Sequence, residues 1–297
     1  MHRMTEMLAA LLLCGPAAAA GAAEQMVAAN GTELAYVEAG SGSPVVFVHG
    51  AISDHRAWDP YREAIAARHH FIAYDQRYFG TRDWPDDGRN FSADTHAADL
   101  VAVAEALGGG PVGLVAWSYG GDVAARAAIA RPDLFSAIVL YEPDVAGLID
   151  GLAGASAAAE HVLAGFGPAI AAVEAGQLED ASLRFIEAVF ALGEGGAEAE
   201  PEEWRNVWRE NGRTIPPFLS APAGDTATCA DLSAVRVPIL VVRGAQSTVY
   251  DVMMAERLAA CAANALVLAM PDSNHDGPYR HPDLFAAMIG SFLDLAE

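Results

Sequence analysis

The chain has 297 residues, of which 17 are basic and 39 acidic, so its formal net charge at neutral pH is −22. It contains no lysine, and every basic residue in that count is an arginine. So large an excess of acidic side chains argues against nucleic acid or an anionic lipid surface as a partner. The length suffices for one domain with an inserted lid and a large buried core, and nothing in the sequence fixes an oligomeric state.

The N-terminus has the features of a secretory signal peptide. Met1-His2-Arg3 is followed by an apolar stretch over residues 7–14 and then by an alanine-rich run. We expect residues 1–23 to be the signal peptide, cleaved after Ala22 or Ala23, and the mature protein to be periplasmic or extracellular. The apolar stretch is too short to cross a bilayer, so no membrane span is expected.

The remainder alternates between short apolar runs and helical patterns. Asn30-Gly31, between residues 26–29 and 33–37, predicts a two-residue β-hairpin. The later apolar runs lack clear alternation, which is typical of strands covered on both faces. These runs are residues 44–48, 71–74, 112–117, 137–141, 238–242 and 265–268. The predicted helices between and after them are residues 58–68, 94–107, 119–129, 255–263 and 282–295. This alternation implies right-handed crossovers and a mostly parallel sheet.

The apolar run 112–117 ends at Ser118, and small residues, Ala116 and Gly120, stand two positions away on either side. This pattern is typical of a nucleophile elbow, a strained strand-to-helix turn that holds the serine Oγ out at the carboxyl edge of the sheet. Bulky side chains at the two flanking positions would clash inside so tight a turn. A helix that begins near Tyr119 would direct its first amides and the positive end of its dipole at an oxyanion formed there.

A segment between the sixth and seventh core strands has a helical composition. Its alanine- and leucine-rich stretches are punctuated by glycines, which favours several short helices. They are residues 152–164, 169–175, 183–192 and 202–211. We expect a helical lid over residues 145–231 and a core made of residues 24–144 and 232–297. Trp204 and Trp208 would share one face of a lid helix, either lining a pocket or anchoring the lid on the core.

Four motifs occur in a specific order: His49-Gly50, an Asp-x-Arg-x-x-Gly loop at residues 75–80, the elbow at Ser118, and His275 after the last predicted strand. In this order and spacing the chain resembles the α/β-hydrolase family over about residues 24–295. The resemblance implies an α/β fold whose mostly parallel, twisted sheet is flanked by helices, with a helical cap inserted after the sixth strand.

The resemblance also implies roles for individual residues. Ser118 would be the nucleophile and His275 the general base, and the backbone amides of Ala51 and Tyr119 would form the oxyanion hole. His49 is expected to be a structural hydrogen-bonding residue of the loop beside that hole. Ala116 stands where the family usually has glycine.

The third member of the triad is open. The family commonly has an aspartate in a Gly-x-x-Asp arrangement after the seventh strand, but residues 244–247 read Gly-Ala-Gln-Ser, so Ser247 stands in its place. The candidates are Glu142, directly after the sixth strand, then Asp251, then Asp144. We favour Glu142, because its strand should neighbour the elbow strand and because some relatives use this position. The alternative role for Glu142 is to bind loop amides at the entrance to the lid.

The expected reaction is acyl transfer to water. Ser118 Oγ, deprotonated by His275, would attack a carbonyl, and water would then hydrolyse the acyl-enzyme. The expected substrate is a small or medium ester or lactone, and the chemistry implies neither a metal nor an organic cofactor. Two alternatives remain open. One is a carbon–carbon bond hydrolase or a cofactor-free haloperoxidase-like enzyme; the other is a catalytically silent binding protein, which the missing Gly-x-x-Asp acid would favour.

Removal of the signal peptide would leave two cysteines, Cys229 and Cys261. In an exported protein they could form a disulfide between the end of the lid and the predicted helix 255–263, or remain two separate buried thiols. We favour the disulfide.

Overall fold

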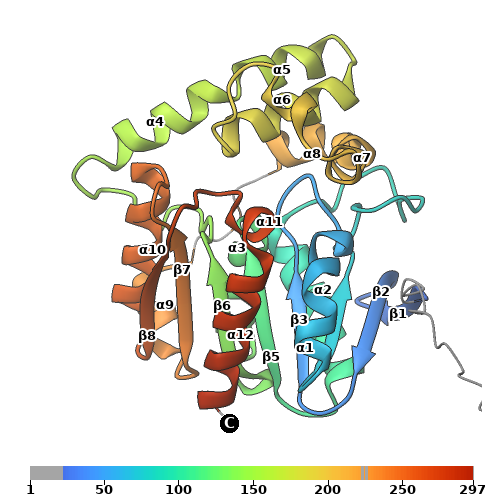
Figure 1. Ribbon diagram of the computed structural model, residues 1–297, viewed down its shortest axis with the longest axis vertical. Helices are drawn as coiled ribbons and strands as arrows, with labels where there is room; N and C mark the ends of the chain where they lie inside the picture. The colour runs from blue at the N-terminus through green and yellow to red at the C-terminus, as the bar shows by residue number, and fades with distance from the viewer. Residues whose placement is uncertain (1–22, 222–223, 225–226, 297) are drawn as a thin grey trace, which may run out of the picture.

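The computed structural model describes residues 23–221, 224 and 227–296. The predicted signal peptide, except for Ala23, therefore lies outside the described residues. Among these residues, eight strands form one twisted sheet through the middle of the molecule (Figure 1). In spatial order they are β1 (Gln25–Ala29), β2 (Thr32–Gly40), β4 (His70–Tyr74), β3 (Pro44–Val48), β5 (Val112–Trp117), β6 (Phe135–Tyr141), β7 (Ile239–Gly244) and β8 (Ala265–Met270).

The strands are parallel except at one end of the sheet. β1 pairs with β2 and β2 with β4 in antiparallel fashion, whereas β4, β3, β5, β6, β7 and β8 are parallel neighbours. The β1–β2 turn has positive φ at Asn30 (44°) and Gly31 (78°), as a two-residue hairpin with this sequence requires. The fold class predicted from the sequence is confirmed.

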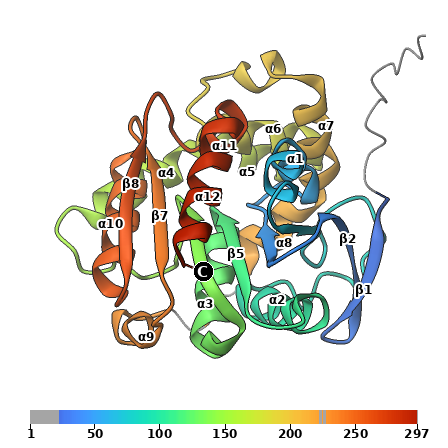
Figure 2. The ribbon, with the colours of Figure 1, turned by 60° about the horizontal axis from the view of Figure 1, so that its bottom comes forward.

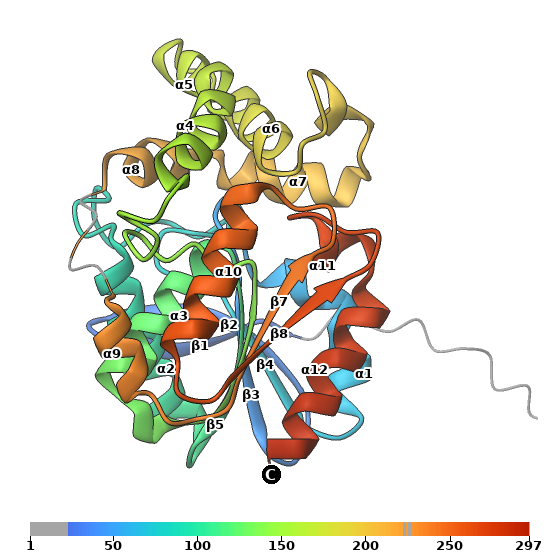
Figure 3. The same cartoon turned by 90° about the vertical axis from the view of Figure 1, so that its left-hand side faces the viewer.

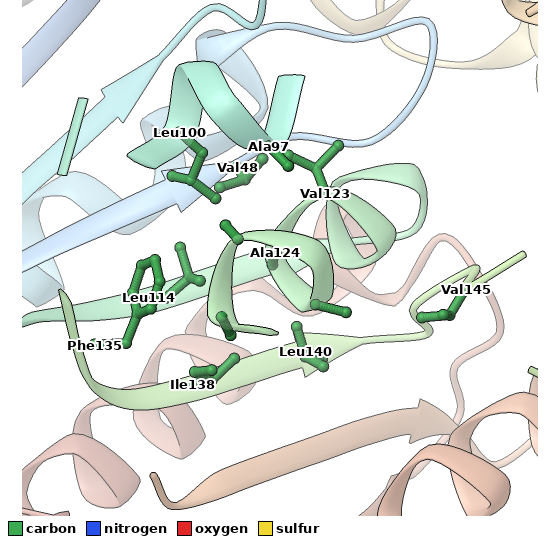
Figure 4. Packing of buried hydrophobic residues seen from close by; sticks show 14 of the residues in the cluster. Val48, Ala97, Leu100, Leu114, Val123, Ala124, Phe135, Ile138, Leu140 and Val145 are labelled. Carbon is green, nitrogen blue, oxygen red and sulfur yellow. The ribbon is translucent and has the colours of Figure 1, made fainter. Parts of the chain in front are cut away.

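Helices cover both faces of the sheet (Figures 2 and 3). One face packs on α2 (Ala93–Gly108), α3 (Tyr119–Ala130), α9 (Cys229–Ala234) and α10 (Val249–Cys261). The other packs on α1 (Arg62–Ala66) and α12 (Pro282–Ala296). In Figure 4, Leu100 of α2 lies beside Val48 of β3, and Val123 of α3 lies beside Ala97 of α2; these side chains are almost wholly buried. Removal of this apolar surface from water is the main stabilising contribution of such a core.

The expectation that the strands are covered on both faces is wrong for β8. β8 lies at the end of the strand order, and Leu266 and Leu268 are 63% and 45% exposed. Ala265 and Val267 alternate with them and pack against the core that contains α10. β8 is therefore covered on one face.

Two predicted helices have different bounds. The segment predicted as one helix over residues 58–68 is a 3₁₀ helix, η1 (His55–Tyr61), followed by the short α1. Pro60 lies inside η1 and lacks the N–H that an α-helix needs. The helix predicted over residues 255–263 is α10, which begins at Val249.

The chain between β6 and β7 forms the cap, which we define as α4 (Ala155–Gly165), α5 (Gly167–Glu174), α6 (Leu178–Val189), α7 (Glu202–Asn211) and α8 (Ile215–Ser220). These helices form a layer above one edge of the sheet (Figures 1 and 3). In the part of the chain that the structure describes, no one helix is long and apolar enough to span a membrane; α4 and α5 reach that length together, with a bend of 44°.

A disulfide joins Cys229, at the start of α9, to Cys261, at the end of α10, with their Cα atoms 4.8 Å apart. The favoured alternative for the two cysteines is therefore correct, and the bond connects the segment that returns from the cap to a helix of the core.

Candidate active site

Ser118 lies in the turn between β5 and α3 with φ 56° and ψ −125°. A residue other than glycine in such a conformation stores strain, which the surroundings must hold. The Ser118 N–H donates to the carbonyl of Tyr141 (3.0 Å), and the Ser118 carbonyl accepts from the amides of Gly121 (2.7 Å) and Asp144 (3.2 Å). The end of β6 therefore fixes the turn on both sides.

Small residues let the backbone pass close to the serine. A Cβ on Gly120 would lie 2.5 Å from the His49 carbonyl oxygen and 2.7 Å from that of Val48, so the predicted clash at this position is confirmed. A Cβ on Gly50 would lie 3.2 Å from the Ser118 Cβ. The His49-Gly50 loop therefore packs directly against the elbow.

His275 follows β8 and contacts two of the other predicted site residues. Its Nε2 lies 2.9 Å from Ser118 Oγ, and its Nδ1 lies 2.8 Å from Glu142 Oε2. Its neighbour Asn274 accepts a hydrogen bond from the Tyr141 hydroxyl (2.5 Å) and donates its side-chain N–H to the carbonyl of Phe190 (3.0 Å). The histidine loop is thus bound both to the sheet and to the chain that leaves α6.

Glu142 is 1% exposed and has a positive φ of 40°. While Oε2 faces His275, Oε1 accepts from the Gly244 amide (2.7 Å) and from the Ser247 hydroxyl. Glu142 therefore contacts the histidine and also binds a loop amide. Ser247, which stands where the family usually has its acid, donates a hydrogen bond to the carboxylate that faces His275.

The other two candidate acids have different partners. Asp144 is exposed and accepts from the Tyr250 hydroxyl (2.7 Å). Asp251 accepts from Thr248 Oγ1 (2.6 Å). Among the described residues, neither carboxylate makes a hydrogen bond to His275. Glu142 is thus the candidate that the structure brings into contact with the histidine.

Nearby carboxylates act on the imidazole of His275. Burial lowers the pKa of His275, but the hydrogen bond and negative charge of Glu142, with Asp251 and Asp144 further away, raise it above its usual value overall. His49 is also buried, and desolvation lowers its pKa. Its Nδ1 lies 2.8 Å from the Gly50 carbonyl oxygen and its Nε2 accepts from the Gln76 amide (3.1 Å), so His49 has structural partners on both nitrogens.

The two amides predicted for the oxyanion hole lie at the right elements. Tyr119 is the first residue of α3, so its N–H has no acceptor within the helix. Ala51 follows Gly50 in the loop that packs on the elbow. Ala51, Ser118 and Tyr119 are all partly exposed.

Aromatic side chains connect the cap to the site. Phe190, at the end of α6, stacks on Trp117 with ring centroids 6.0 Å apart and lies 6.2 Å from the ring of His275. Trp204 and Trp208 of α7 both contact Tyr279, at 4.7 and 6.0 Å. Tyr279 belongs to the short α11 (Gly277–Arg280) just after His275. Of the two roles considered for the tryptophans, the contacts with Tyr279 match the anchor.

One cap residue that sequence reasoning missed reaches two core loops. Asn211, at the end of α7, donates to Asp54 Oδ2 (2.7 Å) and accepts from the Gly80 amide (2.8 Å). Asn211 and Asp54 are fully buried, and Asp54 lies three residues after Ala51. No short pattern marks this contact, because Asn211 and Asp54 are 157 residues apart.

Among the described residues, two groups of side chains place ligand atoms close enough together to hold a cation: Glu142 with Asp251 and His275, and Glu24 with His55 and Asp75. In each group the histidine Nδ1 lies within hydrogen-bond distance of a carboxylate, 2.8 Å in the first and 2.6 Å in the second.

Comparison with known proteins gives a consistent result. Residues 45–288 match the model of a family described as the alpha/beta hydrolase family. The chain is 26% identical over 276 residues to a protein named for non-heme bromoperoxidase from Mycobacterium tuberculosis, a match covering 88% of this chain and 98% of that one.

Two solved structures have a similar fold. An alpha/beta hydrolase from Sphaerobacter thermophilus has a TM-score of 0.71 at 22% identity, covering 91% of this chain and 100% of the other. A thermophilic esterase from Thermogutta terrifontis has a TM-score of 0.67 at 21% identity, covering 93% and 99%.

Proposed function

Because the chain belongs to the alpha/beta hydrolase family, we propose that it is a serine hydrolase that cleaves a small or medium ester or lactone through an acyl-enzyme intermediate. One observation carries the proposal: the unbroken line of short contacts from Ser118 Oγ through both nitrogens of His275 to Glu142, at 2.9 and 2.8 Å. A nucleophile, a base and an orienting acid in this order activate a serine.

The reaction has two matched halves. His275 Nε2 takes the proton of Ser118 Oγ as the oxygen attacks the carbonyl carbon, and the oxyanion accepts hydrogen bonds from the amides of Ala51 and Tyr119. Collapse of the intermediate breaks the bond to the alcohol oxygen, which takes the proton from His275. Water then attacks the acyl-enzyme with the same base, and Ser118 recovers its proton as the acid product leaves.

Glu142 has the role of the triad acid in this proposal. Its Oε2 accepts from the Nδ1 side of His275, which fixes the imidazole with Nε2 facing the serine. Its Oε1 is fixed by the Gly244 amide and the Ser247 hydroxyl, so the carboxylate is oriented before substrate arrives.

The test is hydrolysis of p-nitrophenyl esters from acetate to decanoate, with Ser118→Ala as the paired variant. We expect ester hydrolysis by the unmodified chain and its loss in Ser118→Ala, with rapid fluorophosphonate labelling of Ser118 in the unmodified chain alone. A folded protein that neither cleaves any ester nor labels would overturn the proposal and favour a binding protein of the same fold.

A second candidate is a cofactor-free haloperoxidase-like activity, which the similarity to the Mycobacterium tuberculosis protein favours. It would use the same Ser118 and His275. Bromination of a dye that depends on peroxide, bromide and a carboxylic acid, and that is lost in Ser118→Ala, would support it. If the enzyme cleaves esters but does not brominate the dye, the haloperoxidase-like activity is ruled out.

We also propose that the protein is exported. The disulfide between Cys229 and Cys261 supports this, because structural disulfides persist mainly in oxidising compartments. The N-terminal sequence of the mature protein checks it, with Ala23 or Glu24 as the expected first residue. An intact Met1 on protein recovered from the cytoplasm would contradict it.

A further inference from the structure

A second carboxylate lies beside the pair formed by His275 and Glu142. Asp251, in the first turn of α10, has a carboxylate oxygen within 4.8 Å of both a nitrogen of His275 and an oxygen of Glu142. Glu142 follows β6, whereas Asp251 comes from a helix more than a hundred residues further along the chain. Two acidic side chains from separate elements therefore converge on one buried imidazole.

The local structure gives Asp251 one role that needs no histidine. Thr248 caps α10 by accepting from the Asp251 amide (3.3 Å), and its hydroxyl donates to Asp251 Oδ2 (2.6 Å). The chain repeats this arrangement at the start of α9, where the Thr228 side chain accepts from the Asp231 amide (3.2 Å) and donates to its carboxylate (2.5 Å). Asp231 is exposed. The two helices thus share a capping geometry but differ in what surrounds the aspartate.

The surroundings of Asp251 are acidic. Burial raises the pKa of Asp251, and the charge of Glu142 raises it further, whereas His275 acts in the opposite direction. A carboxylate that only caps a helix can remain in water, as Asp231 does. Asp251 instead lies partly buried next to a like charge, and the group of opposite charge beside it is His275 when the imidazole is protonated.

Other ionisable groups also lie near His275. Asp144 is exposed and bound to Tyr250, and the neighbouring Asp276 is paired with Arg280 at 2.8 Å. The Tyr141 hydroxyl donates to the carbonyl of Asn274, the residue before His275, and the Tyr279 ring contacts Trp117, whose ring also lies against that of His275. The cap contributes the ring of Phe190. Glu142 and Asp251 each place a carboxylate oxygen within 4.8 Å of a His275 nitrogen, and the charge of Asp144 also raises the pKa of His275.

We propose that Asp251 is a positioning residue that stabilises the imidazolium of His275 beside Glu142. A negative charge within about 4–6 Å favours the charged form of a histidine. Glu142 orients the ring through a hydrogen bond, and Asp251 adds charge without one. The part of this inference that concerns catalysis rests on the proposed hydrolase; the part that concerns the charge of His275 does not.

The experiment is a proton NMR titration of His275 in the unmodified chain and in Asp251→Asn, with the resonance assigned by its absence in His275→Gln. Asparagine keeps an oxygen that can accept from Thr248 and removes the charge. We expect the pKa of His275 to fall by about one unit in Asp251→Asn. Asp231→Asn, which makes the same change at the other cap, should leave it unchanged. An unchanged pKa in folded Asp251→Asn overturns the inference.

Two further measurements keep the test decisive. If Asp251→Asn does not fold, Asp251→Ser removes the same charge with a smaller side chain, and the same fall is expected. In the active enzyme, the acidic limb of kcat/KM against pH should move to lower pH with the NMR value. If the pKa of His275 falls in Asp251→Asn but the unmodified chain has no hydrolase activity, this inference stands and the proposed function is wrong. If the chain is an active hydrolase but the pKa does not change, the proposed function stands and this inference is wrong.

Discussion

Glu142 uses both carboxylate oxygens, one toward His275 and the other toward the Gly244 amide and Ser247. Glu142→Gln removes the charge that stabilises the imidazolium, and its amide cannot accept at both places. We expect kcat to fall by about 10³–10⁴-fold, as when a triad aspartate becomes an amide. Rates of ester hydrolysis measure the change in kcat, and circular dichroism spectra check that the variant is folded like the unmodified chain. Asp231→Asn, at the exposed carboxylate in the cap of α9, is the control and should stay within about threefold, the scale of a surface change. Near-normal rates for Glu142→Gln would contradict the role of Glu142.

The sequence left three candidates for the acidic partner of His275, because it does not show which carboxylate contacts the imidazole. It favoured Glu142 because β6 should lie next to β5, and the sheet has that order. It gave no indication that Ser247 donates to Glu142, because that contact depends on where the ends of β6 and β7 meet. The observed register pairs Tyr141 with Val242, which brings Glu142 level with the start of the loop that contains Ser247. Register between distant strands is a tertiary property that a single sequence does not display.

Gly120 lies where two backbone carbonyls approach the elbow. Gly120→Ala would put a methyl 2.5 Å from the His49 oxygen and 2.7 Å from that of Val48, and backbone at the end of β3 cannot rotate away as a side chain would. We expect the free energy of unfolding to fall by about 2–3 kcal/mol. Urea titration measures it. Gly167→Ala, at the start of α5 with open space around it, is the control and should lose nothing. Equal stabilities for the two variants would contradict this account of the elbow.

At the scale of elements, the type of structure was predictable more often than its ends. The apolar pattern of α10 becomes regular near Ala255, but the helix begins at Val249 because Thr248 caps it. The Thr-x-x-Asp pattern at residues 248–251 was the available signal for that start. Pro60 was the corresponding signal against one continuous helix over residues 58–68. The short helices α8, α9 and α11 went unpredicted, since their few residues show too little periodicity.

The end of α7 is the element that connects the cap to the loop beside the elbow. Asn211→Ala would leave the buried Asp54 carboxylate without one donor and the Gly80 amide without its acceptor. An unsatisfied buried group costs about 1–3 kcal/mol, so we expect unfolding to become easier by about 2–4 kcal/mol. Urea titration measures this change. The side chain of Asn264 donates to Arg236 at the surface, and Asn264→Ala should change stability by less than about 0.5 kcal/mol. If the free energy of unfolding of Asn211→Ala equals that of the unmodified chain, the cap does not depend on this contact.

At the scale of the whole molecule, the layers were predictable and the contacts between cap and core were not. Short apolar strands that alternate with helices predict a mostly parallel sheet covered by helices, and apart from one exposed face of β8 the parallel strands are covered in this way. The cap, in contrast, contacts the core through pairs such as Asn211 with Asp54 and Phe190 with His275. These pairs join residues far apart in the chain. The sequence around one residue of a pair does not indicate which distant residue it will contact. The sequence therefore predicted that a cap exists, whereas the way it is held became visible only in the structure.

The disulfide gives a last test of how the parts cooperate. It spans 32 residues from the start of α9 to the end of α10, and closing a loop of that size reduces the entropy of the unfolded chain. From this loss of entropy alone, the double variant Cys229→Ser/Cys261→Ser should have a free energy of unfolding lower by about 3–4 kcal/mol. Cys261 ends a helix of 13 residues whose first turn contains Asp251, so the bond lies about 15 Å along the helix from the site.

Activity below the melting transition should consequently stay near normal in the double variant, while its melting temperature falls. Reductant should lower the melting temperature of the unmodified chain toward that of the variant and leave the variant itself unchanged, which separates loss of the bond from the effect of the serines. Loss of activity at temperatures where the variant remains folded would contradict this expectation. It would mean that the bond holds α10, and with it Asp251, in position against His275.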